Sequence, residues 1–271
     1  MSASPLLTAA LPAYEVYAIR YATVARRAVD NFLSRNDAHD GPMPLDFYCW
    51  VVRGGGRTVL VDTGFSACSA RARGRAFCLQ PGAALARLGL APEDIGDLIL
   101  THLHYDHAGN VEAYPNARVH LQDAEMRYAT GRYMCFEAMR HFFSVDDVQA
   151  VVRRLYAGRV QFHDGDARLA PGLELYRIGG HTPGLQVVRV HTGRGWIVLA
   201  SDALHYYRNY TDHNPFPAIF HVGDMLEGYA RIRSLADSDA HIVPGHDPLV
   251  AKRYPRMDEE DGIYRLDMPP S

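Results

Sequence analysis

The stretch THLHYDHAGN, residues 101–110, places three histidines and an aspartate within six positions: His102, His104, Asp106 and His107. The whole chain has 14 histidines among 271 residues, so this density is far above its background. The apolar residues before it predict a strand over 97–102 that continues into an extended loop. In an extended chain His102 and His104 point to the same side, so both imidazoles can reach one metal ion. Asp106 and His107 follow where the chain turns, and this spacing suits two adjacent metals better than one.

Further metal ligands are expected at the ends of other predicted strands. His181 lies in the glycine-rich turn GGHTPG after the strand LELYRI, Asp202 follows the strand WIVL, and His246 follows HIV in VPGHDP. Each of these residues comes directly after an apolar strand, so one sheet edge could gather them with the loop 101–110. The sequence therefore predicts a site that the histidine-rich stretch supplies only in part.

The remaining pattern shows strands in two blocks, each followed by helices. Alternating and β-branched residues predict strands over 14–26, 47–53, 57–64, 97–102, 117–122, 173–180, 185–192, 196–203 and 240–245. The glycines at 54–56 predict a hairpin turn. Apolar residues at helical spacing predict helices within 82–90, 122–157 and 224–238, and another beginning at Asp106. These blocks favour two sheets with helices on their outer faces, in a single domain over 1–271 with a helical insertion around 122–157.

Composition narrows the class of protein. A hydrophobic fraction of 48%, a charged fraction of 22% and a net charge of −3 are typical of a globular chain, and no basic block marks a nucleic-acid partner. No apolar run reaches the roughly 18 residues that span a bilayer, so no membrane association is expected. The four cysteines lack metal or disulfide spacing, and no Lys or Arg precedes the apolar stretch 5–13. We therefore expect a cytoplasmic protein.

The motif THLHYDHAGN, with GGHTPG, SDA and PGH downstream, resembles the metallo-β-lactamase superfamily from about residue 59 to residue 247. The resemblance implies an α+β fold: an αβ/βα four-layer sandwich of two mixed β-sheets packed face to face with outer helices. It also implies a dinuclear metal site, usually zinc, with iron or manganese as alternatives. Carried over by position, the resemblance implies that the first metal is held by His102, His104 and His181. The second metal is held by Asp106, His107 and His246, and Asp202 bridges both.

Two such metals define the chemistry that is expected. Divalent cations about 3.5–4 Å apart lower the pKa of a shared water towards about 7 and polarise a substrate carbonyl. Only two carboxylates, Asp106 and Asp202, offset their charge, so the site favours a carbonyl that becomes negative on attack, or a substrate with an anionic group nearby. An ester, lactone, thioester or amide fits this description. Asp106 is also a candidate to carry the proton to the leaving alkoxide.

Within the superfamily the chain is most similar to the N-acyl-homoserine lactonase group, which implies a small-molecule substrate: an acyl-homoserine lactone or a related cyclic ester. A glyoxalase II-like thioesterase is an alternative, although that group usually continues GHTPGH where this chain has Leu185. Another metal-dependent esterase, a non-hydrolytic iron enzyme and a purely structural metal site also remain open, as does a monomer or a homodimer.

One position departs from the lactonase pattern. A tyrosine is typical three residues after the bridging aspartate, where its hydroxyl steadies the substrate carbonyl, and this chain has His205 there. Three explanations stay open: His205 is the catalytic donor, Tyr206 or Tyr207 replaces it, or the substrate differs. The aromatic stretch 202–221 is expected to form a pocket wall, and Asp62 in VDTG is expected to order the turn beside the site.

Overall fold

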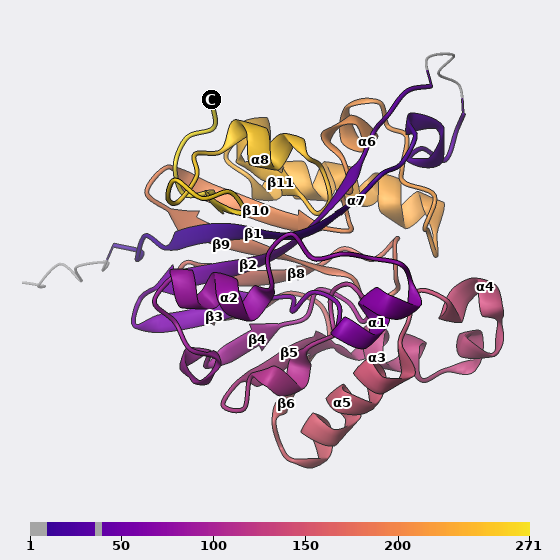
Figure 1. The fold of residues 1–271 in the computed structure, drawn as a ribbon, viewed down its shortest axis with the longest axis horizontal. Coiled ribbons are helices and arrows are strands. Elements are labelled where there is room, and N and C mark those ends of the chain that lie inside the picture. The colour runs from indigo at the N-terminus through magenta and orange to yellow at the C-terminus, as the bar shows by residue number, and fades with distance from the viewer. Residues whose placement is uncertain (1–9, 36–39) are drawn as a thin grey trace, which may run out of the picture.

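The computed structural model describes residues 10–35 and 40–271, and within them the chain forms two β-sheets packed face to face (Figure 1). The larger sheet has the strand order β12-β1-β2-β3-β4-β5-β6 and the smaller one β11-β10-β9-β8-β7. The strands of the larger sheet are β1 (Glu15–Val24), β2 (Leu45–Gly54), β3 (Arg57–Val61), β4 (Asp97–Ile99), β5 (Arg118–Gln122), β6 (Val160–His163) and β12 (Ile263–Arg265). Those of the smaller sheet are β7 (Ala167–Ala170), β8 (Leu173–Arg177), β9 (Gln186–Thr192), β10 (Gly195–Ser201) and β11 (Ile242–Pro244).

Both sheets are mixed. Strands β3 to β6 are parallel, whereas β12, β1, β2 and β3 pair antiparallel, and in the smaller sheet only β10 and β11 are parallel. The helices are α1 (Ala67–Ala72), α2 (Pro81–Arg87), α3 (Asp123–Ala129), α4 (Glu137–Arg140), α5 (Val145–Tyr156), α6 (Tyr207–Thr211), α7 (Val222–Leu235) and α8 (Leu249–Arg253). No helix of the described residues has the length and apolar character that crossing a bilayer requires.

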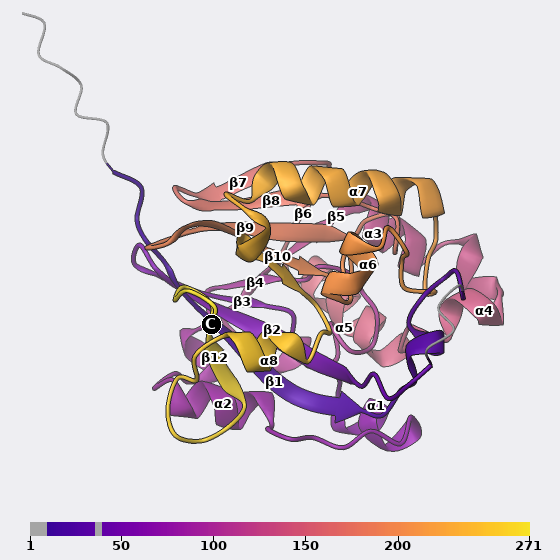
Figure 2. The same ribbon diagram turned by 90° about the horizontal axis from the view of Figure 1, so that it is seen from above.

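Three apolar layers hold the sandwich together. Between the sheets, buried side chains of the larger sheet such as Trp50 and Val59 pack against Val188 and Leu199 of the smaller one. A second layer lies under α5 on the outer face of the larger sheet, and a third lies under α7 on the outer face of the smaller sheet (Figures 1 and 2). Helix, sheet, sheet and helix follow one another, so the predicted αβ/βα four-layer sandwich is confirmed.

The hairpin predicted at 54–56 joins β2 to β3. Gly55 and Gly56 occupy the turn with φ of 57° and 74°, and two consecutive positive values define the type I′ turn, for which glycine has no steric cost. The register pairs Gly54 with Arg57 and Trp50 with Val61. Successive side chains of this hairpin point to opposite faces of the larger sheet, so the hairpin contributes to two of the three apolar layers.

Several elements differ from the sequence-based expectation. Strands β6, β7 and β12 have only three or four residues, too few for alternation to mark them. Strand β4 ends at Ile99 rather than at 102, because the Thr101 N–H donates to the Asp62 carboxylate and leaves the ladder. The helix expected from Asp106 is absent, and the chain there forms turns before a short 3₁₀ helix at Val111–Ala113. The apolar stretch 5–13 lies partly outside the described residues.

Asp147, in the first turn of α5, gives the fold a pH dependence. The residue is 5% exposed and its Oδ2 has no hydrogen-bond partner among the described residues. Burial raises its pKa from 3.8 to about 7, against the hydrogen bond from Ser144. The folded chain therefore holds this proton more tightly than the unfolded chain does, and the free energy of unfolding falls as pH rises from about 4 to about 7.

Asp147→Asn removes this titration. Between pH 4.5 and pH 8 the wild type should lose stability that the variant does not lose. We therefore expect the melting temperature of the wild type relative to that of the variant to drop by roughly 2–4 °C over this range, a value that allows for partial solvent screening. Thermal unfolding followed by circular dichroism measures the difference. The neighbouring exposed Asp146→Asn serves as the control, and an equal pH dependence in both variants would contradict the assignment.

Candidate metal centre

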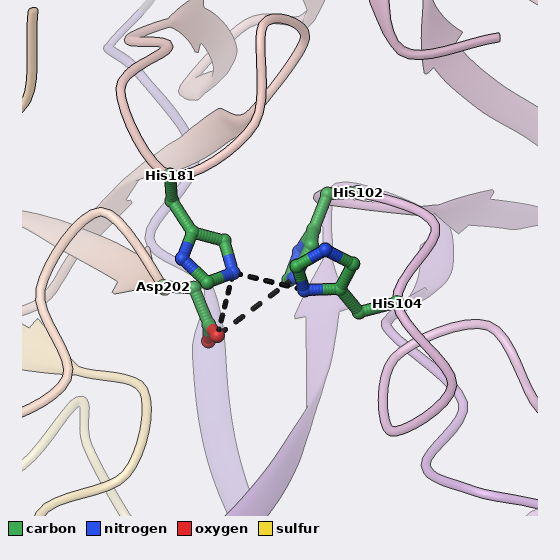
Figure 3. A group of neighbouring side chains, drawn as sticks. All are labelled: His102, His104, His181 and Asp202. Atoms are coloured by element: carbon green, nitrogen blue, oxygen red, sulfur yellow. Dashed lines mark hydrogen bonds and ion pairs between the residues drawn. The ribbon is translucent and has the colours of Figure 1, made fainter. Parts of the chain in front are cut away.

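The seven side chains singled out in the sequence converge at one edge of the sandwich, where the loops after four strands meet. The loop after β4 supplies His102, His104, Asp106 and His107; the loops after β8, β10 and β11 supply His181, Asp202 and His246. Figure 3 shows four of them, with the rings of His102, His104 and His181 turned towards the carboxylate of Asp202. All seven lie in two compact groups, and their role as metal ligands stays a prediction.

The first group combines three histidines with Asp202, and their ligand atoms lie within 4.8 Å of one another. The His104 Nδ1 and His181 Nε2 atoms are 3.0 Å apart, and His181 Nε2 is 3.2 Å from Asp202 Oδ2. His102 Nε2 is 3.8 Å from the same carboxylate. Three imidazole nitrogens and one carboxylate oxygen directed at one point are a ligand set that zinc accepts.

The second group contains Asp106, His107 and His246, and it lies on the other side of Asp202. The Asp202 Oδ1 atom is 3.2 Å from His107 Nε2 and 2.9 Å from His246 Nε2. Asp106 Oδ2 is 3.8 Å from His107 Nε2 and 4.0 Å from His246 Nε2. One oxygen of Asp202 thus faces each group, which is the geometry that a bridging carboxylate needs.

The unpaired atoms of the cluster fit a cationic occupant. Nε2 of His102, Nε2 of His107 and Oδ1 of Asp202 are buried without a hydrogen-bond partner among the described residues. Buried polar atoms normally find a partner, so three orphans directed into one space indicate that something else binds there. Burial lowers the pKa of His102 well below its usual value and that of His181 to about 3, and such neutral imidazoles are ready to bind metal.

Asp202 carries the negative charge of the centre. Its burial disfavours the charged form, but four histidines around it, His246 foremost, outweigh that cost and hold its pKa well below the usual range. Asp202 in turn contributes to raising the pKa of His107 and His246 against the effect of their burial. The carboxylate is therefore ionised and available to bridge two cations.

Asp62 orders the loop that bears the histidines. Its carboxylate accepts hydrogen bonds from the Thr101 N–H (2.8 Å) and the Thr101 hydroxyl (2.7 Å), and it lies 2.7 Å from His107 Nδ1. Asp62 is fully buried and does not line the pocket above the cluster. Such a carboxylate fixes the orientation of the His107 ring, so that Nε2 points towards Asp202.

Glu125, on α3, ties together two loops of the first group and was missed from the sequence. Its Oε1 accepts from the Leu103 N–H (3.0 Å), and its Oε2 accepts from the Thr182 hydroxyl (2.6 Å) and the Gly184 N–H (3.2 Å). Leu103 separates His102 from His104, and Thr182 follows His181. One buried carboxylate thus sets the spacing between the two loops, but a lone glutamate in a helical pattern carries no signal of such a contact.

Close backbone packing positions His246, the last candidate ligand along the chain. A Cβ built on Gly245 would lie 2.6 Å from the Ser201 carbonyl carbon, so only glycine allows the β11 loop to approach the β10 loop here. Ser201 itself has φ of 46°. The contact brings His246 next to Asp202, and the His246 N–H donates to the His205 carbonyl oxygen at 3.0 Å.

A pocket of about 240 Å³ opens above the cluster, and its lining shows which side chain of 205–207 faces the site. His205 lines it, with Nε2 3.1 Å from Asp202 Oδ2 and its ring stacked on Phe216 at 4.0 Å. Tyr206 and Tyr207 do not line it: the Tyr206 hydroxyl donates to the Pro44 carbonyl oxygen, and the Tyr207 ring lies beneath the Arg253 guanidinium. Of the three residues, His205 alone faces the site.

Other pocket walls were only partly anticipated. Phe216 and Ala218, from the aromatic stretch 202–221, line the pocket. Tyr105 does so as well, and so do His141 and Phe142, which belong to the stretch 122–157 that was predicted to be helical. Arg26, Arg73 and Arg75 complete the rim, and no motif pointed to them.

Comparison with known proteins places this geometry in context. A model of the metallo-beta-lactamase superfamily matches residues 44–246. An N-acyl homoserine lactonase of Bacillus cereus is 30% identical over 165 residues, which cover 60% of this chain and 60% of that protein. The match thus spans less than two thirds of the length of this relative.

Two solved structures are similar in fold. A quorum-quenching N-acyl homoserine lactone lactonase superposes with a TM-score of 0.73 at 24% identity, over 88% of this chain and 94% of that one. A dizinc quorum-quenching lactonase, solved in complex with a product, gives a TM-score of 0.71 at 18% identity, over 97% and 96% of the two chains. At these identities the likeness shows a common sandwich architecture.

Proposed function

Since the chain belongs to the metallo-β-lactamase superfamily, we propose that it is a dinuclear zinc hydrolase that opens an acyl-homoserine lactone or a related cyclic ester. The observation that carries the proposal is Asp202, whose two oxygens face two separate ligand groups. The lactonases among its relatives and structural neighbours support a lactone as the substrate.

In this proposal the residues of the site have separate roles. His102, His104 and His181 would hold one cation, Asp106, His107 and His246 the other, and Asp202 would bridge them. Such a pair, when bound, supplies a water of lowered pKa and polarises the substrate carbonyl. The side chain of Asp106 keeps 13% exposure at the floor of the pocket, where it can pass a proton to the leaving alkoxide. His205 takes the place of the tyrosine donor and steadies the carbonyl oxygen.

Metal analysis tests the first half of this proposal. We expect about two equivalents of zinc, iron or manganese in protein purified without chelator, because two ligand groups share one carboxylate. Removing the metal should abolish hydrolysis and lower the melting temperature, since a ligand that binds only the folded state stabilises it. Adding zinc should restore both. Less than one equivalent of any of these metals would contradict a dinuclear centre.

A substrate panel tests the second half. Zinc-loaded protein is offered acyl-homoserine lactones of several chain lengths, other lactones, aryl esters, a glutathione thioester and a cephalosporin, and kcat/KM is measured for each. We expect lactones and activated esters to be cleaved and the cephalosporin to be untouched. Cleavage of the thioester alone would reassign the chain to the thioesterase alternative.

A further inference from the structure

The rim of the pocket above the metal centre is cationic. Arg26, Arg73 and Arg75 all line it, and among the described residues the only acidic side chains in the lining are Asp106 and Asp202. Both of these carboxylates belong to the candidate ligand groups, so their negative charge would neutralise bound metal ions and not the arginines. The arginines therefore add to the positive charge of the centre.

Arg73 and Arg75 form one side of this rim. The Arg73 guanidinium lies 3.9 Å from the centroid of the Tyr105 ring and donates to the carbonyl oxygens of His141 and Phe143. These contacts hold the side chain in place, next to the loop that carries the histidines. Arg75 interacts with the hydroxyl of the same tyrosine, and its Nε is buried without a hydrogen-bond partner among the described residues.

Arg26 forms the other side. Its Nε donates to the Asn31 side-chain oxygen and one Nη to the Asp30 carbonyl oxygen, both at 2.7 Å. Its guanidinium lies 5.1 Å from the Phe216 ring, which stacks on His205. The pocket thus has one guanidinium against Phe216 and two more beside Tyr105.

None of these three arginines forms an ion pair with a carboxylate in the part of the chain that the structure describes, whereas arginines elsewhere do. The charge of Arg73 acts on the Asp147 carboxyl, whose pKa it lowers, without a direct contact between the two side chains. Arg20 pairs with Asp46, and Arg53 pairs with Glu15. A counter-charge favours a half-buried guanidinium group, because it offsets the cost of taking that charge out of water. A planar guanidinium matches the oxygens of a carboxylate or phosphate and stays charged at any physiological pH. An anionic ligand would supply the missing partner.

We propose that the substrate of this site bears a carboxylate or phosphate group in addition to the carbonyl that is hydrolysed, and that Arg73 and Arg75 bind this anion while Arg26 extends the same field across the pocket. The inference rests on the proposed hydrolase function and narrows its substrate class: a charged lactone or ester is preferred over a neutral one with an alkyl chain of equal length. Clustered cations also focus the field in a cleft and raise the local concentration of an anionic substrate.

The experiment compares 4-nitrophenyl pentanoate and mono-4-nitrophenyl glutarate with the zinc-loaded protein; both esters have a five-carbon acyl chain, which ends in a methyl group in the first and in a carboxylate in the second. We expect kcat/KM to favour the glutarate ester on the order of tenfold or more, and the preference to shrink as ionic strength rises. In Arg73→Gln/Arg75→Gln the ratio of the two values should fall close to 1. Arg71→Gln, an exposed arginine of α1 outside the pocket, is the matched control and should keep the wild-type ratio.

A binding arm separates this inference from the proposed function. Calorimetry with glutarate and, separately, with n-propyl phosphate shows whether the site prefers a carboxylate or a phosphate. We expect binding to the wild-type protein that weakens about tenfold or more in the double variant. Arg26→Gln provides an independent variant if the double variant does not fold. Loss of all hydrolysis with this binding intact would overturn the hydrolase function alone. Equal kcat/KM for the two esters, or binding that the arginine variants leave unchanged, would overturn the anionic substrate.

Discussion

Asp202→Ala is expected to lower kcat/KM by on the order of a thousandfold or more and to reduce bound metal from about two equivalents to one or fewer. The reason is geometric: Asp202 belongs to the first ligand group, and its Oδ1 atom lies 3.2 Å from His107 Nε2 and 2.9 Å from His246 Nε2 of the second group. Without it each group loses an oxygen ligand, and the negative charge that lies between the two cations and reduces their repulsion is removed. Activity assays and metal analysis on the same preparation measure both effects.

Asp202→Asn is the isosteric companion. It keeps the volume of the side chain but removes the charge that four histidines stabilise, so we expect it to lose most of the activity while folding like the wild type. Asp166→Asn, an exposed carboxylate paired with Arg231, controls for the loss of a negative charge elsewhere. Wild-type turnover in Asp202→Ala with one equivalent of metal would rule out a bridging role and favour a mononuclear site.

The candidate ligands could be located from the sequence because they follow the ends of strands, and the end of an apolar strand can be recognised from its residues. The runs before His102, His181, Asp202 and His246 are apolar and β-branched, so their placement at one sheet edge followed from the pattern. The layer architecture was predictable for the same reason, since the long strands alternate clearly.

What the sequence could not supply are contacts between elements that no local pattern couples. Arg73 and Arg75 lie in an irregular segment after α1, and only the tertiary fold brings them over Tyr105. The same holds for the three-residue strand β12, whose pairing with β1 is decided by the folded core and not by its own residues. Position 205 was ambiguous because three adjacent aromatic side chains fit a loop equally well until the backbone fixes their directions.

Glu125→Ala is expected to destabilise the fold by about 3–5 kcal/mol, because it leaves the N–H groups of Leu103 and Gly184 and the hydroxyl of Thr182 buried without an acceptor. The loss should also reach the metal centre. Leu103 and Thr182 adjoin three of the first group's ligands, so the two loops can separate once the shared acceptor is gone. We expect zinc affinity to fall by about 10–100-fold, the usual effect of losing a residue that orients metal ligands.

Glu125→Gln should be milder, because burial raises the pKa of Glu125 to about 7 and a neutral amide therefore resembles a form that the protein already populates near neutral pH. A destabilised protein could lose metal merely by unfolding, so the control is Ile232→Ala, which removes a buried side chain of α7 from the opposite layer at a cost of about 2–5 kcal/mol. Zinc affinity is measured by competition with a chelator well below both melting temperatures. If Glu125 acts by holding the loops, Glu125→Ala weakens zinc binding and Ile232→Ala does not. Equal affinities in these two variants would reduce Glu125 to a residue that only stabilises the fold.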